Sequence, residues 1–331
     1  MGKKANNLTK IKVRFANATL CCTLAIAGVT LLEVDHINRN NIEQMIRLKR
    51  ELKYIKENPI ELASDQEISI CTINVQNKYT SEDSKFQSGS DLVLSLVEDD
   101  VDVFGVQEMK CSTASSLENC LQDYQYNLTG EPRWGDGIIG TCFNFANETN
   151  SIIGSTLYMS KTVTLPWIPQ SIDELTRGIE QGSIMARIVT SSVVAIDDVG
   201  YVRCYNTHLD YGVPSIQRRQ MDALLELIDN DTMELSLPII ITGDFNAEPE
   251  SENMMYFMEQ LSKRNIHVAV GDSNTYKGKK TDGSYTELPK QLDYIFYSDD
   301  FTMTNYQIIS NPSSDHDAVL IKLSHSSNNC K

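Results

Sequence analysis

Four short polar motifs each follow an apolar, β-branched stretch of this chain, and their positions restrict the folds that it can adopt. The motifs are Gln107-Glu108, Asn206-Thr207-His208-Leu209-Asp210, Gly243-Asp244-Phe245-Asn246 and Ser314-Asp315-His316. Apolar β-branched stretches favour buried strands, and loops at strand ends commonly carry binding and catalytic residues. The sequence therefore predicts that acids, amides and two histidines meet at one end of a sheet, an arrangement suited to a divalent metal and a phosphate ester.

Short apolar stretches alternate with amphipathic ones along the chain after about residue 67. The expected strands are 67–74, 101–106, 152–159, 183–197, 200–207, 237–242, 265–270, 291–298, 302–309 and 317–323. The expected helices are 88–98, 113–122, 215–229 and 251–264. Many strands with few helices between them predict two packed sheets with helices on their outer faces.

The N-terminus combines basic residues with an apolar stretch. Lys3, Lys4, Lys10, Lys12 and Arg14 precede the apolar residues 15–32. This pattern predicts a signal peptide or a signal anchor over residues 1–35, with a buried globular helix as the alternative. We therefore expect a secreted protein, or a single-pass membrane-anchored one whose globular domain lies outside the cytoplasm.

The rest of the chain divides into three parts by composition. Helix formers and many charges at 37–57 predict a helical stalk or linker over residues 36–66, broken at Asn58-Pro59. The globular domain is expected at 67–325, followed by a short tail at 326–331.

The eight cysteines show no paired spacing of a zinc site. Cys71 and Cys204 lie in expected strands, where a free cysteine usually acts as a small buried hydrophobe. Cys111 and Cys120 could form a disulfide in an extracytoplasmic domain, with ordinary free thiols as the alternative.

The net charge of −16 argues against tight, nonspecific binding to polyanions, because each phosphate contact needs a lysine or an arginine. It does not exclude a nuclease with a local basic patch and a metal-charged cleft. The lysines of the polar loop 272–290 could form such a patch, or only a solvated face.

Each motif also has an ordinary structural explanation. Glu108 could be a surface acid, His208 a hydrogen-bonded structural residue, and Asp244 an Asx-turn residue before a helix. Asp293 lies in a stretch that resembles a buried strand, where an aspartate needs a partner. His316 is the expected partner, since a bonded carboxylate fixes the tautomer of a histidine and raises its basicity.

Taken in order, the motifs N…QE…NTHLD…GDFN…LDYIF…SDH resemble those of the endonuclease/exonuclease/phosphatase superfamily of DNase I-like enzymes. The resemblance covers residues 68–323. It implies an α/β fold, a four-layer α/β sandwich with two packed mixed β-sheets flanked by helices. The active site is then expected at one end of the two stacked sheets.

The resemblance also implies a metal site and a histidine–aspartate pair. Glu108 is the expected principal ligand of Mg²⁺, with Asn74 and Asp315 close by, and Mn²⁺ or Ca²⁺ as alternative metals. His316, oriented by Asp293, is expected to be a general base or to stabilise the charge of the phosphate.

The remaining implied site residues concern water and phosphate. Asp244 activates or positions the attacking water, or protonates the leaving group. Asn246 and His208 are expected to bind the scissile phosphate, with Asn206 beside them. Arg187 matches an arginine near the phosphate or the cleft.

We therefore expect a monomeric Mg²⁺-dependent phosphodiester hydrolase. The preferred hypothesis within this class is a DNase I-like endonuclease that acts on nucleic acid. A sphingomyelinase, or a phosphatase of phosphoinositides or inositol phosphates, is the alternative within the superfamily. An inactive, membrane-tethered binding module is the alternative of another class. A phosphorylated-lipid substrate would favour exposed apolar groups near the cleft, such as Trp134 with Ile138-Ile139 or Trp167 with Pro166, although burial also explains them. In every case the N-terminal segment is the expected membrane contact.

Overall fold

The computed structural model describes residues 42–60, 67–75, 101–108, 126–129, 142–147, 157–181, 187–196, 200–271, 274–278, 288–311 and 314–325. The chain divides into two units, Met1–Tyr54 and Ile55–Lys331. Residues 42–57 are helical, within the helix expected at 37–57. Within the described ranges no helix is long and apolar enough to cross a membrane, and the apolar residues 15–32 lie outside these ranges.

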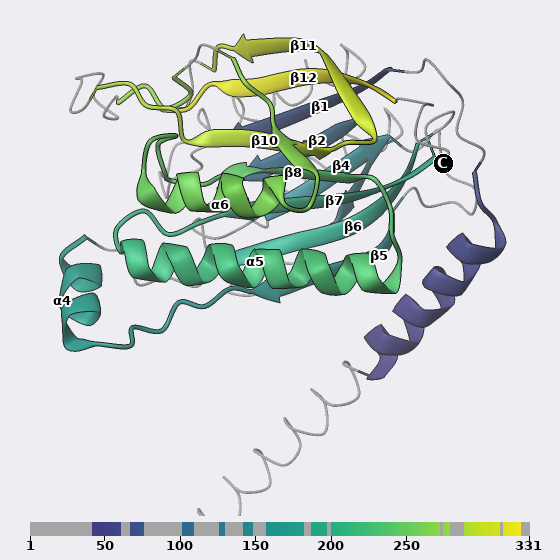
Figure 1. Ribbon diagram of the computed structural model, residues 1–331, viewed down its shortest axis with the longest axis horizontal. Helices are drawn as coiled ribbons and strands as arrows, with labels where there is room; N and C mark the ends of the chain where they lie inside the picture. The colour runs from purple at the N-terminus through teal and green to yellow at the C-terminus, as the bar shows by residue number, and fades with distance from the viewer. Residues whose placement is uncertain are drawn as a thin grey trace, which may run out of the picture. The chain divides into compact units, whose positions relative to one another are not determined.

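The second unit is built on two mixed β-sheets of six strands each (Figure 1). The first sheet has the order β11-β12-β1-β2-β4-β3, with β1 Glu67–Asn74, β2 Val103–Gln107, β3 Tyr126–Thr129, β4 Cys142–Asn147, β11 Phe301–Ile309 and β12 Ala318–His325. The second has the order β5-β6-β7-β8-β10-β9, with β5 Leu157–Thr164, β6 Ile188–Ile196, β7 Gly200–His208, β8 Ile239–Asp244, β9 Ile266–Val268 and β10 Asp293–Ser298.

Each sheet contains one parallel pair of strands, β1 with β2 and β7 with β8. The parallel register places Asn74 beside Gln107 and His208 beside Asp244, so the carboxyl ends of these strands meet at one edge. Every residue of β7 is buried, as expected of a strand that is covered on both faces. The fold therefore brings the polar strand ends together.

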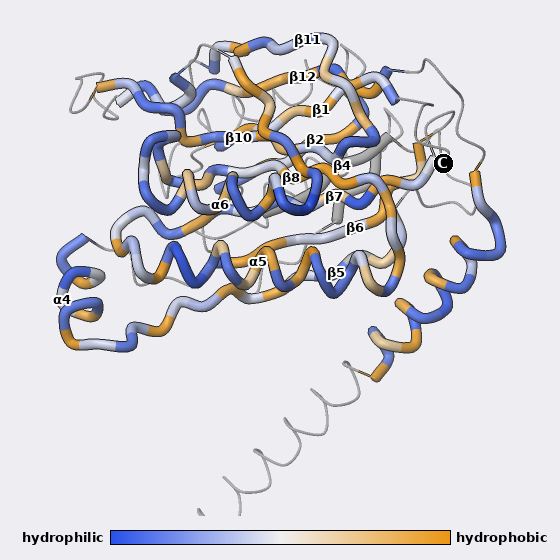
Figure 2. Tube along the Cα trace, viewed as in Figure 1, coloured by the Kyte–Doolittle hydropathy of each residue, from blue (hydrophilic) through white to orange (hydrophobic). Residues whose placement is uncertain are grey.

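The described helices of the second unit are α4 Ile172–Gln181, α5 Pro214–Glu234 and α6 Glu252–Ser262. Helices α5 and α6 lie on the outer face of the second sheet, where their apolar residues pack against those of β8 and β10. Both helices alternate between hydrophilic and hydrophobic residues along their length (Figure 2), which is the pattern of burial on one side. The start of α6 is fixed by Ser251, whose side chain accepts a hydrogen bond from the Met254 backbone N–H.

A second apolar cluster fills the space between the sheets. Ile70 and Ile321 of the first sheet pack there with Val202 and Ile240 of the second. Cys204 belongs to the same cluster, and both Cys204 and Cys71 are free and buried, as predicted.

The predicted fold class is confirmed, with differences in particular elements. The strand expected at 152–159 instead lies at Leu157–Thr164, and β3, β4 and α4 were not predicted. The expected helices 88–98 and 113–122, and Cys111 with Cys120, lie outside the described residues. The start of helix α4 could have been predicted from the sequence, because Ser171 and Glu174 have the spacing of a capping box. In the structure the backbone N–H of Glu174 donates a hydrogen bond to the Ser171 hydroxyl at the N-cap.

The two sheets approach each other closely at Gly105 of β2. A Cβ atom at this position would lie 2.0 Å from Oγ1 of Thr242 and 2.7 Å from Oδ1 of Asn206, both in the second sheet. Thr242 is β-branched and lies in a strand, so its side chain cannot easily move away. Glycine is therefore required where the sheets meet.

We predict that Gly105→Ala lowers the free energy of unfolding by about 1–3 kcal/mol, because the added methyl group overpacks the space between the sheets. Urea denaturation followed by circular dichroism measures the change. Thr304→Ala on the exposed part of β11 is the control, with an expected effect within about 0.5 kcal/mol. An unchanged urea midpoint for Gly105→Ala would show that the sheets can separate locally without lowering the free energy of unfolding.

Candidate active site

A cavity of about 860 Å³ opens at the edge where the parallel strands end. Most of the predicted site residues line it: Glu108, Arg187, His208, Asp244, Asn246, Asp315 and His316. Asp293 lies behind His316 and is buried, and Asn74 is buried beside Asp244. The structure thus gathers side chains that are more than two hundred residues apart in the sequence.

Asp244, the last residue of β8, is at the centre of the polar contacts. Its Oδ2 accepts a hydrogen bond of 2.9 Å from the Asn74 side chain, and its Oδ1 accepts one of 2.9 Å from the Asn246 backbone N–H. The Nε2 atoms of His208 and His316 lie 3.6 and 3.7 Å from Oδ2. One carboxylate therefore faces two imidazole rings and an amide.

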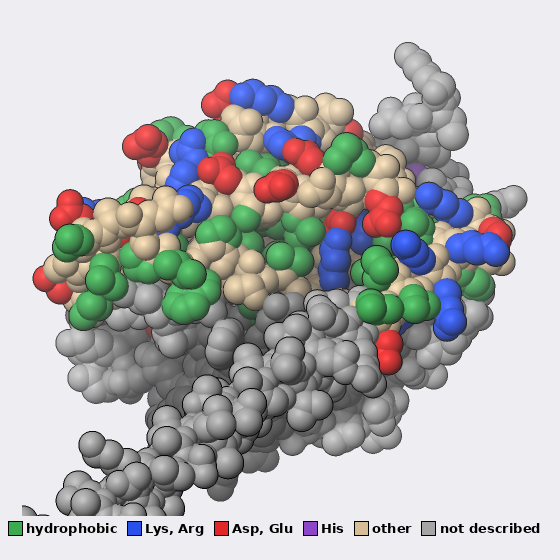
Figure 3. Space-filling view, turned by 90° about the horizontal axis from the view of Figure 1, so that it is seen from below, with side chains coloured by type: hydrophobic (Ala, Val, Ile, Leu, Met, Phe, Trp, Pro, Cys, Tyr) green, Lys and Arg blue, Asp and Glu red, His purple; other side chains and the backbone are tan. Residues whose placement is uncertain are grey.

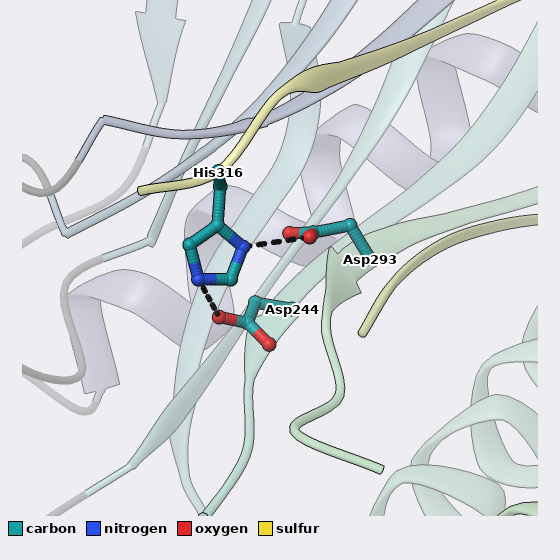
Figure 4. Close-up of side chains that lie close together, drawn as sticks. All are labelled: Asp244, Asp293 and His316. Atoms are coloured by element: carbon teal, nitrogen blue, oxygen red, sulfur yellow. Dashed lines mark hydrogen bonds and ion pairs between the residues drawn. The ribbon is translucent and has the colours of Figure 1, made fainter. Parts of the chain in front are cut away.

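Asp293 and His316 form the pair that the sequence predicts. Nδ1 of His316 lies 2.7 Å from Oδ2 of Asp293, and the other nitrogen of the ring faces Asp244 (Figure 4). Asp293 is the first residue of β10 and lies opposite Asp244 in the antiparallel register with β8. The backbone of His316 also forms an isolated antiparallel β-bridge with Tyr276, which helps to hold His316 in place.

The net effect of burial and neighbouring charges is to raise the pKa of both Asp244 and His316. Burial and the neighbouring charge of Asp293 raise the pKa of Asp244 to about 7, and His316 opposes part of the rise. Burial alone would lower the pKa of His316, but the charges of Asp293 and Asp244 outweigh it and raise that pKa to about 10. At neutral pH the cluster therefore holds a charged imidazolium beside a carboxyl group close to its midpoint.

His208 is the neutral member of the site. Burial, together with the positive charges of Arg187 and His316, holds the pKa of His208 well below its usual value. Its ring can therefore donate or accept a hydrogen bond without carrying charge. Among the described residues, its Nδ1 has no hydrogen-bond partner.

Glu108 lies at the end of β2 with a positive φ of 56°, a conformation that non-glycine residues adopt rarely and mostly at functional sites. Burial raises the pKa of Glu108, the charges of His316 and Arg187 oppose this, and the charge of Asp315 adds to it. Two carboxylates, Glu108 and Asp315, thus face the same cavity and repel each other, and the charges of His316 and Arg187 offset part of this repulsion. A divalent cation with oxygen ligands fits this position, with Glu108 and Asp315 as the ligands and the Asn74 amide beside them.

A second group of residues also has a spacing that could hold a metal. Ligand atoms of Asp244, Asp293 and His316 lie within 4.8 Å of one another. Nδ1 of His316 is already hydrogen-bonded to Oδ2 of Asp293, so this nitrogen is not available as a metal ligand while the pair is intact. The metal position predicted from the sequence, at Glu108 and Asp315, offers oxygen ligands, which suit Mg²⁺ better than a histidine-containing set.

The loop after β8 is held in a strained conformation. Asn246 has a positive φ of 50°, which asparagine tolerates better than most residues. Its side chain donates to the Leu209 carbonyl at 3.0 Å, and Gln217 of α5 donates to the carbonyls of Phe245 and Asn246 at 3.1 and 3.0 Å. Helix α5 thereby fixes the position of Asn246 at the cavity.

Asn206 is a predicted site residue that the structure does not bring to the cavity. We expected it beside the phosphate, but it is fully buried between the sheets. Its Oδ1 accepts hydrogen bonds from Gln107 at 2.7 Å and Thr242 at 3.0 Å, and its Nδ2 donates to the Val106 carbonyl at 3.0 Å. These bonds join the sheets, so the expected phosphate-binding position is wrong for Asn206.

Several residues of the cavity wall were not predicted, among them Tyr211, Gln217, Tyr276 and Leu292, whereas Lys290 is one of the lysines of the loop 272–290 that were considered as a basic patch. Tyr211 directly follows the Asn206–Asp210 motif, and its neighbourhood could have been read as part of that motif. Gln217, Tyr276 and Leu292 lie in helices or loops whose approach to the cavity is set by tertiary structure. No local pattern marks them.

The comparisons with known proteins agree with the fold. The family model of the Endonuclease/Exonuclease/phosphatase family matches residues 71–316, which is well over half of the chain. The chain belongs to this family. Members of the Endonuclease/Exonuclease/phosphatase family hydrolyse phosphate esters and are generally metal-dependent. Among curated protein sequences, none matches the chain significantly.

Solved structures share the fold at low sequence identity. A family member from Bacteroides thetaiotaomicron is 20% identical, with a TM-score of 0.61, and the match covers 80% of this chain and 97% of that one. The mannosyl-6-phosphatase of the same organism is 20% identical, with a TM-score of 0.58 and coverage of 77% and 99%. The human Nocturnin catalytic domain, with bound sulfate, is 20% identical, with a TM-score of 0.57 and coverage of 81% and 97%.

We predict that Glu108→Gln weakens the binding of Mn²⁺ or Mg²⁺ by more than the roughly 10–100-fold that substitutions around a metal ligand cost, because it removes the charged ligand. Isothermal titration of the metal-stripped protein measures this binding directly. Glu259→Gln on the exposed side of α6 is the matched control and should bind the metal as the wild type does. An unchanged metal affinity of Glu108→Gln would indicate that the metal binds at the Asp244–Asp293–His316 group instead.

The raised pKa of His316 predicts a pH dependence of stability. The folded state keeps the proton up to about pH 10, whereas a histidine with the ordinary value of 6.5 loses it much earlier. This contribution to the free energy of unfolding is complete below pH 6.5 and is lost as the pH rises through 10, with a slope of about 1.4 kcal/mol per pH unit between these values. Urea denaturation in EDTA at several pH values should therefore show a steeper decline for the wild type than for His316→Asn.

Thr304→Ala, which removes no titratable group and lies on the exposed part of β11, is the control for this experiment and should keep the wild-type slope. Only the slope is compared, because His316→Asn also lowers stability by leaving Asp293 without its partner. Equal slopes in the wild type and in His316→Asn would mean that His316 is neutral in the folded protein.

Proposed function

We propose that this protein is a divalent-metal-dependent hydrolase that attacks phosphate esters with water. The observation that carries the proposal is the environment of Asp244, a buried carboxyl group with two imidazole rings within 3.7 Å and a pKa raised to about 7. Such a group can accept a proton from water near neutral pH, since a general base works best when its pKa lies near the working pH.

The other side chains have complementary tasks in this proposal. Asp244 takes the proton of the attacking water, and Asn246 positions that water. The charged ring of His316, held by Asp293, stabilises the negative charge that develops on the nonbridging phosphate oxygens. The neutral His208 donates a hydrogen bond to the same phosphate, and the leaving oxygen departs on the opposite side of phosphorus.

Arg187 and the carboxylates bind the charged parts of the substrate complex. Arg187 is buried and lines the cavity, where its fixed charge can hold a phosphate oxygen. Glu108 and Asp315 are the residues that would hold the metal, with Asn74 orienting Glu108. When bound, Mg²⁺ or Mn²⁺ supplies positive charge at the phosphate and the leaving oxygen.

The charges around the cavity favour a compact phosphate ester over a long polyanion. Lys290 lies 3.9 Å from Glu248, and Lys277 is hydrogen-bonded to Asp317 and to the Asn311 carbonyl. Glu248 and Glu252 also line the cavity. Contacts to successive phosphates need free basic side chains, and these lysines are already paired with acids or carbonyls. The mannosyl-6-phosphatase with this fold is consistent with a small phosphorylated substrate.

An endonuclease acting on nucleic acid is the second candidate. The motif order favours it, and the fold is shared with the 2′,3′-cyclic phosphatase ANGEL2, whose solved complex contains adenosine-2′,3′-vanadate. ANGEL2 is 16% identical, with a TM-score of 0.54. Phosphorylated lipids and an inactive binding module follow as further outcomes of the same experiment.

Export or membrane anchoring through residues 1–35 also belongs to the proposal, as does a monomeric state. The basic and apolar composition of the N-terminal segment supports the first.

The experiment compares the full-length protein with Asp244→Asn after removal of metal with EDTA and addition of Mg²⁺ or Mn²⁺. Mannose 6-phosphate, adenosine monophosphate, sphingomyelin and supercoiled plasmid are the substrates. We expect release of inorganic phosphate from a small monoester, with a loss of roughly 10²–10⁴-fold in Asp244→Asn. Asp222→Asn, on the exposed side of α5, is the matched control and should keep full activity.

The alternatives give different results in the same assay. Nicking of plasmid that disappears in Asp244→Asn would assign the protein as an endonuclease, and release of phosphocholine would assign it to lipid hydrolysis. A folded protein that binds the metal but converts none of these substrates would contradict hydrolysis and favour the binding module.

A further inference from the structure

Helix α4 exposes a stripe of aliphatic side chains to solvent. Ile172, Leu175 and Ile179 follow one another at helical spacing and are 81%, 44% and 68% exposed, and Ile168 in the preceding loop is 68% exposed. Figure 3 shows apolar side chains gathered over the α4 end of the molecule, at the left of that view. Single exposed apolar residues are common on soluble proteins, but four large ones on a short segment mark an interaction surface. We call these four residues the α4 stripe.

The polar contacts of α4 hold the stripe outward. Arg219 of α5 donates to the Glu174 carboxylate at 3.0 Å and to the Ile168 carbonyl at 3.1 Å. Gln220 of α5 donates to the Pro166 carbonyl at 3.0 Å. Gly178 is the residue of α4 that is buried, so the helix packs on the domain through a glycine and a charged pair. The stripe cannot turn inward without breaking these contacts.

The stripe lies beside the opening of the cavity. The hydroxyl group of Tyr211 donates to the Gln181 carbonyl, at the last residue of α4. Tyr211 is 50% exposed and lines the cavity. A surface that contacts the stripe therefore comes close to the catalytic residues.

We propose that the α4 stripe docks the domain on the surface of a phospholipid bilayer. An amphipathic helix with an outward apolar stripe and a polar remainder is suited to lie in the interfacial region of a membrane. The residues are aliphatic, whereas the centres of protein–protein interfaces are enriched in tyrosine, tryptophan and arginine. The same chain carries at its N-terminus basic residues followed by an apolar stretch, residues 3–32, for which we propose export or membrane anchoring.

The charges of α4 identify the kind of lipid surface. Asp173 and Glu180 are exposed, Glu174 pairs with Arg219, and Arg177 is the exposed basic residue of this helix. Attraction to anionic lipids needs clusters of lysine and arginine. Docking therefore relies on apolar contact, and zwitterionic phosphatidylcholine is a sufficient partner.

The test uses tryptophan fluorescence in the full-length chain. The chain has two tryptophans, and Trp134→Phe leaves Trp167, next to Ile168, as the single reporter. Vesicles of phosphatidylcholine with brominated acyl chains quench a tryptophan that enters the bilayer. The N-terminal segment contains no tryptophan, so its insertion alone gives no signal. We expect quenching of Trp167 with brominated vesicles and none with ordinary ones, and no increase on addition of phosphatidylserine.

The stripe is tested by the triple substitution Ile172→Ser, Leu175→Ser, Ile179→Ser in the single-tryptophan chain. These side chains are exposed, so the fold and the thermal unfolding temperature should not change, and quenching should fall to the level of ordinary vesicles. The matched control places serine at exposed apolar residues elsewhere on the domain, Met233, Met255 and Val270, and should keep the quenching.

Three results would overturn the proposal. The first is a chain that floats with the vesicles without quenching of Trp167, and the second is quenching that persists in the triple variant. The third is a dimer in analytical ultracentrifugation that the triple variant abolishes, which would assign the stripe to contact with a second copy of the chain. None of these measurements depends on catalytic turnover.

Discussion

The hydrogen bonds that join the two sheets set the geometry of the site. Gln107 of the first sheet bonds to Asn206 of the second, and Asn74 bonds to Asp244 in the same way. Apolar side chains between packed sheets permit small shifts, whereas a satisfied buried polar network specifies one arrangement. The carboxylates of Glu108 and Asp315 follow strands of the first sheet, and the carboxylate of Asp244 ends a strand of the second. The catalytic distances therefore depend on the spacing of the sheets at Gly105.

The sequence predicts most strands because their residues are β-branched and apolar, and it predicts the site because polar residues follow those strands directly. It is wrong for Asn206, for a physical reason. Asn206 and His208 are two residues apart and point to the same face of β7. Asn206 lies about 7 Å deeper, where the other sheet still covers the strand. A single sequence does not show where one sheet stops covering the other.

Helix α4 and the cavity wall show a second limit of prediction from sequence. Helix α4 has apolar residues at helical spacing, Ile172, Leu175 and Ile179, but it is short and two prolines precede it. Its capping residues Ser171 and Glu174 were a second signal that the sequence offered. Residues such as Gln217 and Tyr276 reach the cavity from elements whose placement depends on tertiary packing. Prediction from sequence succeeds where functional side chains directly follow a buried strand. It fails where residues reach the cavity from elements that tertiary packing places there.

The parallel register of β7 and β8 has a consequence for how this chain can change over evolution. His208 lies opposite Asp244, and Asp293 lies opposite Asp244 on the other side. Inserting or deleting one residue within β8 would turn its following side chains to the opposite face and break both pairings at once. Substitutions in these strands can accumulate one at a time, whereas a single insertion or deletion disrupts the site in one step. Length variation among relatives should therefore concentrate in loops such as residues 272–290, where substrate preference can diversify without disturbing the reaction.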